Sequence, residues 1–161
     1  MTNSDAAEKK LDQPLWRDYL ELCKPNVVAL MALTAVIGML LAVPGMVPLD
    51  ILLLGNLGIG LCAASAAVIN HVVDKKIDLL MKRTENRPVA QGRLKDSHAL
   101  LFSAAMGLLG MWVLIFYVNE LTALLTLGSL IGYALIYTCF LKRATPQNIV
   151  IGGLAGAAPP L

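Results

Sequence analysis

Charged residues are scarce in this chain, and long stretches of it contain none. Asp, Glu, Lys and Arg together make up 15% of the 161 residues, whereas hydrophobic residues make up 57%. Soluble domains carry about a quarter charged residues, so the composition indicates an integral membrane protein instead. The formal net charge is only +2, which does not favour a nucleic-acid partner.

Cysteines are few, and a targeting signal is not visible. The three cysteines, Cys23, Cys62 and Cys139, are scattered along the chain without the close spacing of metal ligands. We therefore interpret them as small buried hydrophobic residues. The first 25 residues are polar and of mixed charge, which does not fit the basic and apolar regions of a signal peptide.

Long apolar runs are the dominant feature of the sequence. Four of them, at about 26–43, 49–69, 98–118 and 121–141, each come close to the roughly 20 residues that cross the hydrocarbon core of a bilayer. A fifth run, 147–161, contains a Pro-Pro pair and reaches the end of the sequence, so we interpret it as a partial span. The sequence therefore predicts an all-α, multi-pass transmembrane helix bundle, truncated to about four to five spans.

The residues before the first span differ from the rest. Residues 1–12 are polar, and the stretch PLWRDYLELCKPN that follows them places apolar residues among charged ones. This spacing favours a short amphipathic helix on the membrane surface, with Trp16 and Tyr19 at the level of the headgroups. We thus predict two parts, a polar tail with an interfacial helix over 1–25 and an incomplete transmembrane domain over 26–161.

The basic residues indicate how the chain is oriented. All 13 Lys and Arg residues precede the first predicted span, lie between the second and third, or lie between the fourth and fifth. The positive-inside rule then predicts a cytoplasmic N-terminus. The second span is also rich in Gly, Ala and Ser, which favours close packing against its neighbours.

The stretch NHVVDKKIDLLMKRTENRP, residues 70–88, concentrates charge beside the second span. If this span continues as a helix past Ile69, then Asn70, Asp74 and Asp78 share one face, because four residues turn a helix by about 400°. Hard oxygen ligands of this kind suit Mg²⁺, which commonly joins one or two carboxylates to the phosphates of a substrate. The spacing therefore predicts a magnesium site at the membrane surface.

Two arginines follow the carboxylates. Arg83 and Arg87 are four residues apart, and Pro88 places Arg87 at a turn. The planar fork of arginine matches phosphate oxygens, so the combination favours a diphosphate with a lipid-soluble tail. An alternative reading stays open, in which the basic loop serves membrane topology or binds anionic lipid headgroups and the two aspartates pair with neighbouring lysines.

The stretch NHVVDKKIDLLMKRTENRPVAQGRL resembles the first aspartate-rich motif of the intramembrane prenyltransferases of the UbiA superfamily. Within it, LCKPNVVALMALTAVIGML, the D-x-x-M-x-R-T-x-x-R-P pattern from Asp78 to Pro88, and YTCFLKRATPQNIVIGGLAGAAPPL resemble the haem O synthase (protohaem IX farnesyltransferase) branch. The resemblance implies that farnesyl diphosphate, held through Mg²⁺ by two aspartate-rich motifs, alkylates a vinyl group of haem b and yields a hydroxyethylfarnesyl side chain.

The resemblance also implies roles for individual residues. Asn70, Asp74 and Asp78 match the first motif and would bind the metal, and Asp74 and Asp78 would act in catalysis with Arg83 and Arg87. The residues implied to bind the substrate are Asn70, Arg83, Arg87, Lys142 and Arg143. The second motif of the family has no match in this sequence, so we expect the 161-residue chain alone to be inactive.

The same resemblance places the protein in the bacterial inner membrane, with haem A synthase or terminal-oxidase assembly proteins as candidate partners. Two other functions stay open at this point. One is a prenyltransferase that acts on a quinone precursor or another aromatic acceptor. The other is a non-catalytic membrane module that binds anionic lipid.

Overall fold

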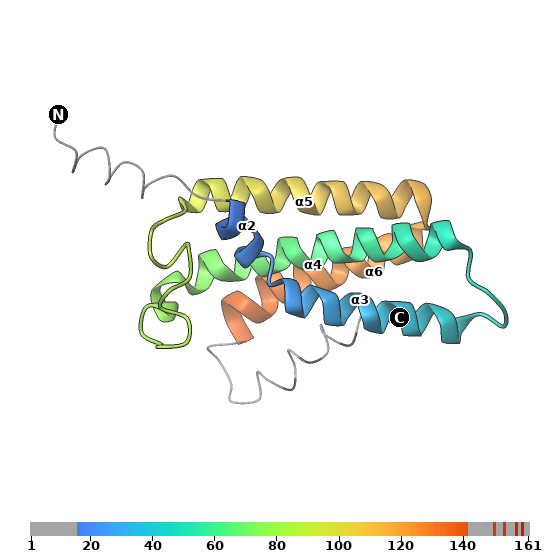
Figure 1. Cartoon of the computed structure of the whole chain (residues 1–161), viewed down its shortest axis with the longest axis horizontal. Helices are drawn as coiled ribbons and strands as arrows, with labels where there is room; N and C mark the ends of the chain where they lie inside the picture. The colour runs from blue at the N-terminus through green and yellow to red at the C-terminus, as the bar shows by residue number, and fades with distance from the viewer. Residues whose placement is uncertain (1–15, 142–149, 151–152, 154–156, 158, 160–161) are drawn as a thin grey trace.

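The structure, a computed structural model, describes residues 16–141 and, beyond them, residues 150, 153, 157 and 159 (Figure 1). This part of the chain consists of helices and turns and contains no strand, which confirms the predicted all-α class. The elements are α2 (Trp16–Leu22), α3 (Pro25–Ala42), α4 (Leu49–Asp78), α5 (Asp96–Tyr117), α6 (Glu120–Ile131) and the π-helix η1 (Gly132–Leu141).

Three of these helices, α3, α4 and α5, are long and apolar enough to cross a membrane. The fourth predicted span is helical over its whole length, but it changes from the α-helix α6 to the π-helix η1 at Gly132. Within η1, the Thr138 hydroxyl donates to the backbone carbonyl of Tyr133 at 2.7 Å. Periodicity in the sequence does not reveal such a change.

The helix α4 lies at the centre of the bundle. It packs against α5 along much of its length and also contacts α2, α3, α6 and η1 (Figure 1). The segment 79–95 after α4 forms turns that close one end of the bundle, and its residues Val89 and Leu94 are fully buried there against Leu22 and Val68. The end of α4 is therefore held between α2 and this segment.

The short helix α2 forms where the amphipathic pattern predicts a helix. Trp16 is exposed, but Asp18 and Leu22 are buried, and the Tyr19 ring packs edge-to-face on Phe102 of α5 at 5.0 Å between centroids. The helix is thus fastened to the bundle, and its position at the level of lipid headgroups stays a prediction.

Small residues bring α4 and α5 into close contact, as the composition of the second span predicts. The hydroxyls of Ser65 and Ser103 are 3.0 Å apart, and Ser103 also donates to the Ser65 carbonyl at 3.0 Å. A Cβ atom added to Gly110 would lie 2.8 Å from the backbone oxygen of Gly58. Backbone cannot yield as a flexible side chain does, so the helices approach each other only because these residues are small.

We expect Gly110→Ala to loosen the contact between α4 and α5. The added methyl group forces the backbones apart, and overpacking of this kind costs about 1–3 kcal/mol of stability. Gly128→Ala in α6 is the matched control, because a Cβ there meets nothing within 4 Å and alanine favours the helix. Thermal unfolding in detergent measures both variants, and equal stability for the two would contradict the account.

Candidate functional site

The helix α4 continues past Ile69 and ends at Asp78, as the predicted magnesium site requires. Asn70, Asp74 and Asp78 are 4%, 1% and 3% exposed, so all three are buried inside the bundle rather than on its surface. Burial of three polar side chains on successive turns of a helix costs free energy unless each has a hydrogen-bond or ion-pair partner. Those partners come from three different parts of the chain.

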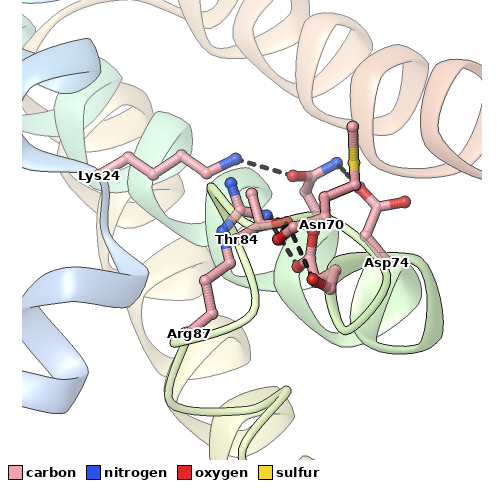
Figure 2. A network of polar contacts seen from close by, with 7 residues as sticks. Lys24, Asn70, Asp74, Thr84 and Arg87 are labelled. Carbon is pink, nitrogen blue, oxygen red and sulfur yellow. Dashed lines mark hydrogen bonds and ion pairs between the residues drawn. The ribbon is translucent and has the colours of Figure 1, made fainter.

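Asp78 binds Arg87 from the segment after the helix. A single guanidinium nitrogen, Nη1 of Arg87, donates to both carboxylate oxygens at 2.9 and 2.8 Å (Figure 2). The turn that makes this contact is set by Thr84, whose hydroxyl donates to the Asp78 carbonyl at 3.0 Å and so satisfies a backbone group at the end of α4.

Asn70 and Asp74 form a second set of contacts, one turn earlier in α4. The Asn70 amide donates from Nδ2 to Asp74 Oδ2 at 2.9 Å, and its oxygen accepts from Lys24 Nζ at 2.7 Å (Figure 2). Lys24 lies between α2 and α3, 46 residues away in the sequence. We refer to Lys24, Asn70, Asp74, Asp78 and Arg87 as the polar cluster.

The segment that carries Arg87 is fastened to α2 by Arg93. One guanidinium nitrogen of Arg93 pairs with the buried carboxylate of Asp18 at 2.5 Å, and the other donates to the Asn86 carbonyl at 2.9 Å. Because Asn86 directly precedes Arg87, these contacts hold the arginine of the polar cluster in place. Lys75 pairs with Asp96 at 2.8 Å, and Asp78 pairs with Arg87 rather than with a neighbouring lysine as the alternative reading proposes.

The other predicted site residues do not join the polar cluster. Arg83 is exposed, and in the part of the chain that the structure describes it has no hydrogen-bond or ion-pair partner. Lys142 and Arg143 lie outside the described residues. The sequence did not single out Lys24 or Thr84, since a lysine before a span and a threonine in a basic loop are ordinary features of membrane proteins.

The polar cluster fits a magnesium ion that shares its coordination with a substrate. Among the described residues, no group of three or more His, Cys, Asp and Glu side chains could hold a metal by itself. Two carboxylates and one amide oxygen are instead what Mg²⁺ uses when phosphates and water complete its coordination. All three donors are hard oxygen atoms on one buried face of α4, which suits this ion.

An apolar cavity of about 410 Å³ adjoins the polar cluster. It lies between α3, α4, α6 and η1, and most of its wall is aliphatic. On α4 the wall includes Ile59, Ala63, Ala66 and Ala67, and Asn70 and Asp74 continue the same face of that helix toward its end. Lys24 belongs to both the cavity wall and the polar cluster, so the two are directly connected.

The sequence profile of the UbiA prenyltransferase family matches residues 31–161. The chain belongs to this family. That match covers most of the chain and includes α4, the segment after it and the part of the cavity wall that begins at Met31. The match confirms the family resemblance seen in the sequence.

Several curated relatives that match the chain share one name. Those of Saccharophagus degradans, Marinobacter nauticus and Teredinibacter turnerae are 73%, 68% and 66% identical over 146 residues, and each is called protoheme IX farnesyltransferase. The aligned part is 91% of this chain and 47–48% of each relative. The chain thus spans about half the length of these relatives. No solved structure matches it.

Proposed function

We propose that this chain forms part of a membrane enzyme that transfers a farnesyl group from farnesyl diphosphate to a vinyl group of haem b, giving haem O. The observation that carries the proposal is the buried row of Asn70, Asp74 and Asp78 in a polar cluster that adjoins an apolar cavity. The names of the relatives support the choice of donor and acceptor. The positive-inside rule supports a cytoplasmic position for the cluster at the inner membrane.

The polar cluster would bind the diphosphate of the donor. Asn70, Asp74 and Asp78 would hold Mg²⁺, and Arg87 would place its guanidinium beside the phosphate oxygens. When bound, Mg²⁺ supplies Lewis-acid stabilisation of the negative charge that develops on the leaving diphosphate. Arg87 is fixed in advance by Asp78, and a donor that is already oriented stabilises developing charge without reorganisation.

The cavity would hold the isoprenoid tail. Its volume falls in the range of small-molecule sites, about 300–1,000 Å³, and Val, Leu, Ile, Met and Ala side chains make up most of its wall. In the reaction, the bond between the isoprenoid carbon and the diphosphate oxygen breaks and both electrons leave with oxygen. The vinyl group forms the new carbon–carbon bond, and water then adds to the resulting cation and releases a proton. An apolar wall protects the allylic cation until the acceptor attacks.

A chimera tests the proposal. Residues 1–161 replace the matching half of the Saccharophagus degradans relative, and the chimera is expressed in a bacterial host whose own haem O-forming gene is deleted. We expect haem O in the extracted membranes, detected by chromatography and mass spectrometry, and we expect chelation of divalent ions in isolated membranes to abolish its formation.

The control is the same host with the relative itself. A chimera that reaches the membrane in normal amounts but makes no haem O, while the relative does, would contradict the proposal. Prenylation of an added aromatic quinone precursor without haem O would instead support the alternative acceptor.

A further inference from the structure

Lys24 has the least common backbone conformation in the described part of the chain. Its φ of 49° and ψ of 63° are left-handed, and it is the one residue other than glycine with a positive φ among the described residues. Pro25 follows it and opens α3. A side chain disfavours this conformation, which persists only where the surroundings fix it and which is concentrated at functional sites.

That conformation directs the lysine toward the site. The Lys24 ammonium donates to Asn70 at 2.7 Å, and the same side chain forms part of the cavity wall (Figure 2). Among the described residues of that wall, Lys24 is the one that carries a charge, and the polar others are hydroxyl or thiol side chains. The positive charge therefore lies where the apolar cavity meets the polar cluster.

We propose that Lys24 is a further substrate-binding residue, which contacts the diphosphate of the isoprenoid donor. This inference rests on the proposed function. An isoprenoid whose tail fills the cavity has its diphosphate at the boundary that Lys24 occupies. An ammonium carries three donors that turn freely, so one lysine can bridge the Asn70 oxygen and a phosphate oxygen.

A purely structural role makes a different prediction. If Lys24 only fastened α3 to α4 through Asn70, its loss would lower stability and would weaken every ligand of the cavity alike. If Lys24 binds the diphosphate, its loss weakens ligands that carry a diphosphate and spares those that share only the tail.

The experiment measures ligand affinity in the chimera, reconstituted in lipid nanodiscs with Mg²⁺. The two probes are farnesyl thiolodiphosphate, which does not react, and farnesol, which has the same tail without the diphosphate. We expect Lys24→Met to raise the Kd for farnesyl thiolodiphosphate by about 10- to 100-fold, the usual effect of a hydrogen bond to a charged group. We expect the Kd for farnesol to stay within about twofold, and Lys24→Arg to retain most of the affinity.

Two further variants separate binding from folding. Lys24→Gly removes the side chain but suits the left-handed backbone, so we expect higher thermal stability than in Lys24→Met and the same loss of affinity. Lys76→Met is the matched control, because Lys76 is exposed near the end of α4. We expect it to bind both probes as the parent does.

The outcomes are distinct. Equal weakening of both probes, or unchanged binding of farnesyl thiolodiphosphate by Lys24→Met, would overturn the role of Lys24 and leave the proposed function intact. If the unsubstituted chimera bound farnesol but not farnesyl thiolodiphosphate, the proposed function itself would fail and this inference with it.

Discussion

Asp74→Asn in the chimera is expected to lower the rate of haem O formation by about 100- to 1,000-fold, the effect of removing one preorganised group that stabilises developing charge. Asp74 is 1% exposed and accepts a hydrogen bond from Asn70. Asparagine has nearly the same shape, so the helix end should keep its packing. What the variant loses is the negative charge that holds a divalent cation against the diphosphate.

The dependence on magnesium distinguishes this loss from simple misfolding. Asp74→Asn should need a higher Mg²⁺ concentration for half-maximal rate, and Asp78→Asn should behave in the same way. Asp50→Asn is the matched control, since Asp50 is an exposed aspartate at the opposite end of α4. A non-catalytic module that binds anionic lipid predicts that both site variants are tolerated, so an unchanged rate in both would refute the enzymatic account.

Arg87→Ala is expected to damage both catalysis and stability. The Asp78 carboxylate is buried, with 5% of its side chain exposed, and Arg87 supplies its ion pair. Removal of one partner of a buried pair costs about 3 kcal/mol or somewhat more, because a charge is left without compensation. The rate of haem O formation should fall about 100-fold relative to the parent chimera, which is the effect of losing one oxyanion donor.

A second substitution separates the two effects. In the double variant Asp78→Asn with Arg87→Ala, the uncompensated charge is gone, so thermal stability should recover while the rate stays low. Lys82→Ala serves as the control, because Lys82 is exposed in the same segment and should change neither quantity. If activity recovered together with stability, Arg87 would support only the fold.

Local periodicity explains which parts of the site were predictable. The i, i+4, i+8 spacing of Asn70, Asp74 and Asp78 places them on one face of any helix. Their common face therefore required only that α4 continue past Ile69, which it does. Likewise, Pro88 marks the turn at Arg87 because proline restricts the residue before it. The long uncharged runs made the all-α class predictable for a different reason. A backbone in lipid must satisfy its own hydrogen bonds, and an α-helix does so within one segment.

Contacts between distant residues explain what could not be predicted. Lys24 meets Asn70 across 46 residues and Asp18 meets Arg93 across 75, and no sequence period links such pairs. Arg83 and Arg87 look equivalent in the sequence, yet of the two it is Arg87 that contacts the Asp78 carboxylate, because Thr84 and Arg93 fix the turn before it. The cavity likewise depends on how four helices pack.

The central claim is that the oxygen atoms of α4 hold a divalent ion against the diphosphate of an isoprenoid. The most direct test is electron paramagnetic resonance of Mn²⁺, used in place of Mg²⁺, with farnesyl thiolodiphosphate and the chimera in nanodiscs. The account predicts a bound Mn²⁺ with hyperfine coupling to phosphorus, and loss of that signal in Asp74→Asn and Asp78→Asn. The same coupled signal in both variants, at the same Mn²⁺ concentration, would contradict it.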